Sequence, residues 1–77
     1  MKVMKLKFAE KFKKSLIVYY GYNPKNSEVA LLISTNISPV TTETVRRWRL
    51  GLNLPEIETL KKISQVLDID LTNLFEN

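Results

Sequence analysis

The sequence lacks cysteine and histidine altogether. Without cysteine there are no disulfides, thiol redox chemistry or cysteine–zinc sites, and without histidine there is neither imidazole catalysis nor the commonest metal ligand. No other constellation of nucleophile, base or metal ligands is visible in the chain. We therefore expect a protein that is not an enzyme and that needs no cofactor or metal.

Long apolar runs are also missing. The longest covers residues 29–33, far short of the roughly 20 residues that a membrane-spanning helix needs. The lysine-rich N-terminus has no continuous apolar stretch of the kind found in a secretory signal. With only two Gly and three Pro, the chain is not of low complexity either. We expect a soluble cytoplasmic protein.

What is present is the composition of an ordinary folded domain, with 44% hydrophobic and 26% charged residues among 77. This length allows one domain spanning residues 1–77, stabilised by apolar packing alone. The net charge of +4 is unevenly spread, because residues 1–25 hold seven Lys against one Glu. A basic front half suits a protein that meets a polyanion, although a solvated helix without a partner fits as well. Residues 1–5 are a candidate for a flexible basic arm, or simply a frayed end.

Apolar spacing predicts an all-α fold of five short helices and no strand. Phe8, Phe12 and Leu16 form a stripe on a first helix over residues 5–20. A second helix is expected from residue 26 or 27 to about 34, followed by a turn segment over 35–40. A fourth runs from after Pro55 to about 67, and Asp70 caps a fifth that carries three apolar residues. These are Leu71, Leu74 and Phe75.

The third helix carries the most informative pattern. Thr41 and Thr42 are helix-capping residue types, and Gly51 readily adopts the left-handed turn that follows a helix. Val45 and Trp48 share one face, so we expect Trp48 in the core rather than as a platform for stacked bases. The opposite face carries hydroxyl, carboxylate and guanidinium groups, which hydrogen-bond phosphates and base edges in the DNA major groove.

Residues 40–75 resemble the lambda-repressor-like, Cro/CI-type family of helix-turn-helix DNA-binding domains. Residues 44–75, TVRRWRLGLNLPEIETLKKISQVLDIDLTNLF, resemble the family's recognition helix, its glycine-containing loop, its proline and its last two helices. The positions that carry the resemblance are Ala30, Val45, Trp48, Gly51, Pro55, Leu60, Ile63, Leu67, Ile69, Leu71 and Leu74. The fold this implies is a compact five-helix domain whose second and third helices form the helix-turn-helix.

Three features depart from the family pattern. The stretch between Ala30 and Val45 is longer than usual, so the two helices are joined by a lengthened turn. Arg49 stands where the family commonly has an acid, and its role is open. Ser64 replaces the usual Ala of the fourth helix, which requires a hydrogen-bond partner for its hydroxyl.

The resemblance implies roles for individual residues. Asn26 and Ser27 fall where the second helix grips a phosphate, and Asn53 falls on a second phosphate contact. Arg47 is the first choice for base reading, because Arg pairs bidentately with guanine; Glu can accept from cytosine N4 and Thr can meet a thymine methyl. The predicted DNA-binding residues are Asn26, Ser27, Thr41, Thr42, Glu43, Arg46, Arg47 and Asn53.

The function that follows is sequence-specific binding of double-stranded DNA by a transcriptional regulator, a phage- or prophage-type repressor that occupies an operator. The resemblance implies a bacterial or phage-encoded, nucleoid-associated protein that reads a palindrome as a homodimer. Leu71, Leu74 and Phe75 are the candidate dimer contact. Two alternatives remain, namely the antitoxin of a toxin–antitoxin pair and a protein-interaction module on a helix-turn-helix scaffold.

Two further groups have more than one interpretation. Tyr19, Tyr20 and Tyr22 could stack on single-stranded bases, but we favour core and loop packing for them. The acid pairs Asp68 with Asp70 and Glu56 with Glu58 could suggest metal binding or catalysis. Their places at helix starts and ends favour capping and helix-dipole effects instead.

Overall fold

The computed structural model describes residues 2–74, which form four α-helices and one short 3-10 helix with no strand among them. The α-helices are α1 (Lys2–Tyr20), α2 (Asn26–Asn36), α3 (Thr42–Arg49) and α4 (Ile57–Leu67), and the 3-10 helix is η1 (Thr72–Leu74). The Cα radius of gyration is 11.3 Å, close to the roughly 11.5 Å expected for a compact chain of this length. The predicted all-α class is confirmed.

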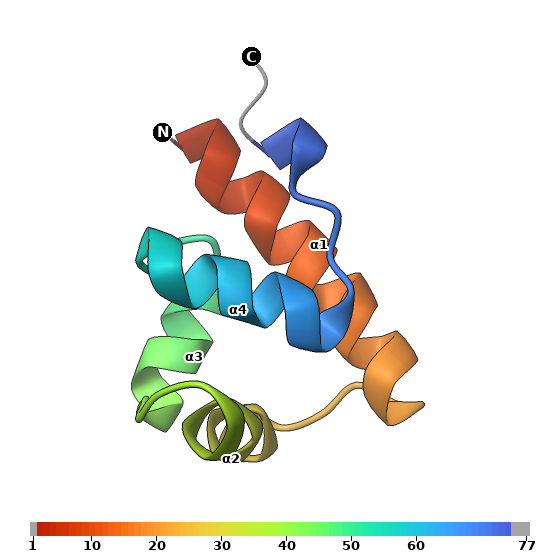
Figure 1. The fold of residues 1–77 in the computed structure, drawn as a ribbon, viewed down its shortest axis with the longest axis vertical. Coiled ribbons are helices and arrows are strands. Elements are labelled where there is room, and N and C mark those ends of the chain that lie inside the picture. The colour runs from red at the N-terminus through yellow and green to blue at the C-terminus, as the bar shows by residue number, and fades with distance from the viewer. Residues whose placement is uncertain (1, 75–77) are drawn as a thin grey trace.

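The longest helix, α1, runs diagonally across the molecule behind α4 in Figure 1, and it contacts α3, α4 and η1. It buries Phe8, Phe12 and Leu16 completely, as their spacing predicted. The rings of Phe8 and Phe12 stack with centroids 5.0 Å apart, and Phe12 meets Trp48 of α3 edge-on at 6.4 Å. The core is thus built around one aromatic row along α1.

The start of α1 differs from the prediction. The helix begins at Lys2 instead of residue 5, so residues 2–5, the candidate arm, continue the helix in this structure. No capping residue type lies near residue 5, and Lys, Met and Leu are all good helix formers. Nothing in the local sequence therefore stops the helix from extending to Lys2.

The predicted fifth helix differs in type and length, because the described residues after α4 form one turn of 3-10 helix at Thr72–Leu74. Asp68 ends α4 in a left-handed conformation with φ 55°, and Ile69 is buried directly after it. The Asp70 carboxylate accepts a 2.9 Å hydrogen bond from the Thr72 amide, which tightens the next turn. Leu74 then reaches the core with 1% of its surface exposed, and Phe75 lies outside the described residues.

The Ser64 hydroxyl has the partner that its place in α4 requires. It donates a 2.6 Å hydrogen bond to the carbonyl of Lys61 one turn earlier. Within residues 2–74, no helix is both long and apolar enough to cross a membrane.

Candidate nucleic-acid interface

The helix α3 has the boundaries that its sequence predicted. Thr41 is the N-cap, and its Oγ1 accepts a 3.1 Å hydrogen bond from the Thr44 amide. At the other end Gly51 has φ 74°, while the amides of Leu52 and Gly51 bond back to the carbonyls of Arg47 and Trp48. This is the paired arrangement of a Schellman cap. A short helix with both ends satisfied can present a fixed outer surface.

The inner face of α3 anchors it in the core. Val45 is 0% and Trp48 5% exposed, so Trp48 is a core residue, as expected. They belong to the same apolar cluster as Val29, Ala30 and Ile33 of α2, which packs against α3. Burial of this face leaves the opposite face of α3 to the surface.

The segment between α2 and α3 is tied to α2 by the Ser34 hydroxyl, in addition to the backbone bonds from the Ile37 and Ser38 amides to the Ile33 carbonyl. The helix α2 ends at Asn36, two residues later than predicted, and the chain reaches α3 through residues 37–41. Ser34 Oγ accepts from the Val40 amide at 3.0 Å and donates to the Val40 carbonyl at 3.1 Å. The segment over residues 37–41 is therefore tied back onto the last turn of α2.

The outer face of α3 exposes the four predicted residues Thr42, Glu43, Arg46 and Arg47. Glu43 and Arg46 form a bidentate ion pair one turn apart, with Nε to Oε1 at 2.8 Å and Nη2 to Oε2 at 2.7 Å. The hydrogen bond from Arg46 lowers the pKa of Glu43 and raises that of Arg46, so both groups stay charged at neutral pH. The pair leaves Arg47 as the arginine of this face without a carboxylate partner among the described residues.

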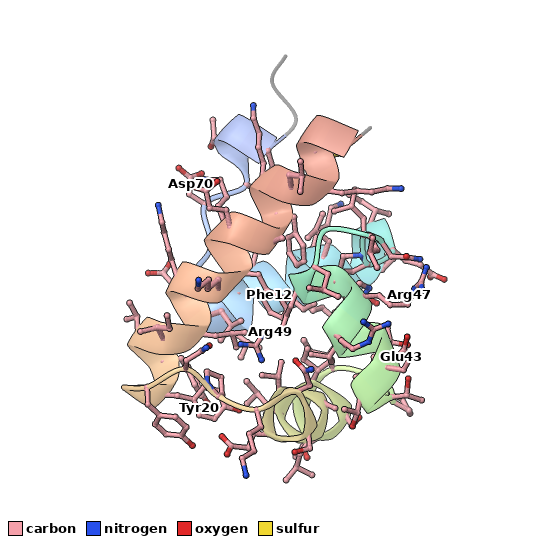
Figure 2. All side chains as sticks on the ribbon, turned by 180° about the vertical axis from the view of Figure 1, so that it is seen from behind. Phe12, Tyr20, Glu43, Arg47, Arg49 and Asp70 are labelled. Carbon is pink, nitrogen blue, oxygen red and sulfur yellow. The ribbon has the colours of Figure 1, made fainter. Side chains whose placement is uncertain are left out.

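Arg47 has a partner of another kind. Its Nε donates a 3.1 Å hydrogen bond to Oδ1 of Asn53, in the loop after α3. Figure 2 shows Arg47 and Glu43 projecting from α3 away from the body of the molecule. The bond to Asn53 occupies the inner nitrogen of the fork and leaves the two terminal nitrogens of Arg47 available. Asn53, predicted as a phosphate contact, thus also orients Arg47.

Arg49 is the residue whose role the sequence left open, and it lies on the inner side of the site (Figure 2). Its Nη1 donates to the Pro24 carbonyl at 2.8 Å and to Asn26 Oδ1 at 3.1 Å, and its Nη2 donates to Asn23 Oδ1 at 2.7 Å. Partial burial lowers the pKa of Arg49, although a guanidinium remains charged at neutral pH. In the sequence, only the unexpected Arg at this position of the family resemblance drew attention to Arg49, and it did not identify these partners.

The start of α2 lies beside this arginine. The N-cap residue Lys25 makes no side-chain cap, so its side chain leaves the amides of the first turn of α2 uncapped. Ser27 is exposed at this end, whereas Asn26 is half-buried with its amide oxygen bound to Arg49. Of the predicted residues, Asn26 at the start of α2 is therefore linked to the end of α3 through Arg49.

The three tyrosines gather elsewhere, at the end of α1 and along α2. Tyr20 is half-buried and donates to the Glu28 carbonyl at 3.2 Å, while Tyr22 donates to the Glu28 carboxylate at 2.6 Å. The accepting carboxylate raises the pKa of Tyr22, and burial raises that of Tyr20. Together with Tyr19 and Leu31 they line an open, mostly apolar groove of about 470 Å³. Tyr19 and Tyr22 are thus half-exposed, more than simple packing predicted.

The acid pairs follow the capping interpretation in part. Glu56 occupies the N-cap position of α4 without a side-chain cap bond, and Glu58 lies in the first turn. The Thr72 amide lowers the pKa of Asp70. Within the described part of the chain, no three acids come together in a way that could hold a metal ion.

No family model, no curated protein and no solved structure matches this chain in the three comparisons made. Its function is therefore inferred from its own residues.

Proposed function

We propose that this chain binds double-stranded DNA in a sequence-specific manner, with α3 as the helix that enters the major groove. The observation that carries the proposal is the division of α3 into two faces. Val45 and Trp48 lock one face into the core. In under three turns, the other face exposes the side chains of Thr41, Thr42, Glu43, Arg46 and Arg47. A rigid, polar helix face with free arginine donors is what base-edge readout requires.

The residues around α3 supply contacts to the DNA backbone. Asn26, Ser27 and the uncapped amides of α2 form one candidate phosphate grip, and Asn53 forms another. The helices α2 and α3, with residues 37–41 between them, then act as a helix-turn-helix with a lengthened turn. The positive net charge of +4 adds a sequence-independent attraction.

The biological role that fits such a module is transcriptional regulation, as a repressor that occupies an operator. One recognition helix reads only a few base pairs, so specificity is expected from a symmetric dimer on a palindrome, with recognition helices about 34 Å apart. Of the predicted dimer contacts, Leu74 is buried in its own chain and cannot face a partner. The dimer proposal therefore retains only Leu71, which is partly exposed, together with Phe75.

A second candidate function is a protein-interaction module on the same scaffold. It is favoured by the Glu43–Arg46 pair, which neutralises part of the proposed DNA face, and by the tyrosine-lined groove beside α2. Exposed apolar surface of this kind is common where proteins bind partners. This candidate predicts a chain that has lost affinity for DNA.

Selection from a random pool of duplex DNA, sequenced after binding, tests the proposal. The affinity of the enriched duplex should be titrated at two salt concentrations for wild type, Arg47→Ala and Lys13→Ala. Lys13 is a matched control, because it is an exposed cation on α1 where no DNA contact is proposed. We expect a short palindromic consensus, steep salt dependence and loss of selectivity in Arg47→Ala alone. Uniform weak binding, or none, would contradict DNA reading and favour the protein-interaction module.

A further inference from the structure

Arg49 joins two segments that are distant in sequence and adjacent in the proposed DNA interface. It is the last residue of α3, and its three acceptors lie in or just before the first turn of α2. Both terminal nitrogens are used, one of them twice. A planar fork of five donors is suited to such a junction, whereas a lysine ammonium is not.

The bonds of Arg49 go to uncharged oxygens only. Among the described residues no carboxylate forms an ion pair with it, so its charge is compensated by carbonyl and amide dipoles. Desolvation makes burial of the Arg49 charge energetically unfavourable. The benefit that offsets this cost is the fixed geometry of its hydrogen bonds. The useful product of that geometry is a fixed relation between the start of α2 and the end of α3.

The bond to Asn26 also fixes which way that side chain faces. A guanidinium can only donate, so the amide oxygen of Asn26 must point to Arg49. Its Nδ2 group is then turned away from Arg49. An amide nitrogen donates hydrogen bonds, and a DNA phosphate only accepts them, so this orientation presents the correct atom to the backbone.

We infer that Arg49 is a positioning residue for DNA recognition. It orients Asn26 as a phosphate donor and holds that grip at a set distance from the base-reading face of α3, so that the two dock on DNA together. The inference rests on the proposed function. It assigns Arg49 no contact with DNA of its own.

The test compares the affinity of the enriched duplex for wild type, Arg49→Gln, Arg49→Lys, Asn26→Ala and the double variant Arg49→Gln with Asn26→Ala. Asn36→Ala is the matched control, because Asn36 is an exposed asparagine at the other end of α2. Each protein is titrated at several salt concentrations, at a temperature where circular dichroism shows it fully folded.

We expect Arg49→Gln and Arg49→Lys each to bind about tenfold more weakly, the loss of roughly one hydrogen bond to a charged group. The slope of log affinity against log salt should stay at the wild-type value, because Asn26 is neutral and no phosphate–cation contact is lost. In the Asn26→Ala background, Arg49→Gln should change the affinity less than twofold. Asn36→Ala should bind like wild type.

Three results would overturn the inference while leaving the proposed function intact. They are wild-type affinity of the Arg49 variants, additive losses in the double variant, and retained affinity in Arg49→Lys together with a smaller salt slope in Arg49→Gln. The last would mean that Arg49 contacts a phosphate directly. If wild type itself shows no salt-dependent binding to duplex DNA, the proposed function fails and the inference fails with it.

Should the Arg49 variants not fold, Asn23→Ala takes their place, since it removes a single acceptor of the Arg49 fork from an exposed loop side chain. A loss of about threefold with an unchanged salt slope is expected, because a weakened fork still holds Asn26 through Nη1. Affinity equal to wild type would count against the inference.

Discussion

At the scale of single residues, the proposed DNA face contains two arginines in different circumstances. Arg46 uses two of its nitrogens in the bidentate pair with Glu43. Arg47 uses only Nε, in its bond to Asn53, and keeps its terminal nitrogens free. Recognition of guanine by Arg needs two parallel donors that are not otherwise engaged. We therefore propose Arg47 as the base reader, with Asn53 as the residue that presets its orientation.

Replacement of Arg47 by Ala should cost about 1–3 kcal/mol of discrimination at one base position and relax the consensus there. Replacement of Asn53 by Ala should weaken the same preference less, because Arg47 keeps its donors but loses a fixed orientation. Competition titrations with duplexes altered at single positions measure both effects. A uniform loss across all duplexes would instead place Arg47 on the phosphate backbone.

The Glu43–Arg46 pair should make the stability of the fold depend on pH, and the sign follows from the lowered pKa of Glu43. The contribution of the pair to stability is fully present above the ordinary glutamate pKa range. It is lost as the pH falls through the lowered pKa of Glu43. NMR titration of the Glu43 carboxyl should show this low value, and Arg46→Gln should bring it back up. Lys13→Gln is the control, and an equal rise in that variant would show a general charge effect.

At the scale of elements, capping residues predicted the boundaries of α3 well, whereas Asp70 precedes a 3-10 turn and no α-helix among the described residues. Thr41 and Gly51 delimit α3 as expected, and α4 ends at Leu67. The start of α1 carries no capping residue, and the predicted start at residue 5 is three residues later than the observed start at Lys2. The predicted end of α2, near residue 34, is too early, because residues 35–40 carry turn-forming residue types while the helix continues to Asn36. The Ser34 hydroxyl bonds to Val40, a contact that depends on the turn already being folded.

Gly51 meets two constraints at once. Its φ is 74°, and an added Cβ would lie 2.8 Å from Leu6 Cδ2 of α1. Gly21 has a similar φ of 81° with nothing within 4 Å of that position. Gly21→Ala should therefore cost about 1–2 kcal/mol for the left-handed conformation alone, and Gly51→Ala should cost only slightly more, because Leu6 Cδ2 is the end of an exposed side chain that can turn aside. Urea unfolding measures the difference, and equal losses would show that Leu6 moves aside freely.

Ser34 should matter to the lengthened turn in proportion to its two bonds with Val40. Ser34→Ala is expected to lower the free energy of unfolding by about 1 kcal/mol, since each net hydrogen bond contributes roughly 0.5–1.5 kcal/mol and Ala regains some helix propensity. The neighbouring Thr35→Ala, also exposed in α2, isolates that propensity gain and should be neutral or slightly stabilising. Thermal and urea unfolding measure the stability of both variants. Equal stability changes in Ser34→Ala and Thr35→Ala would contradict this role of Ser34.

At the scale of the whole molecule, the all-α class and most of the core were predictable, because Phe8, Phe12, Leu16, Val45 and Trp48 repeat at helical spacing. The candidate site was predictable only as a set of residue types. Apart from the Glu43–Arg46 pair, which lies one turn apart, the side-chain bonds that organise it join residues six or more positions apart, such as Arg47 with Asn53 and Arg49 with Asn26. Local patterns contain no information about such partners, because the packing of α2 on α3 and the course of the loop after α3 create them.

The unpredicted 3-10 turn in the C-terminal segment changes the expected dimer contact of the chain. As an amphipathic helix it would have offered Leu74 to a second copy, but the 3-10 turn directs this side chain into the core instead. Leu74→Ala should therefore lower the free energy of unfolding by about 2–5 kcal/mol through the cavity it leaves. Because the contact lies within one chain, the resulting shift in Tm should be the same at every protein concentration. A loss that grows with concentration would instead assign Leu74 to a dimer interface, since association stabilises by mass action. Lys62→Ala on the exposed side of α4 is the control, with a shift near zero expected.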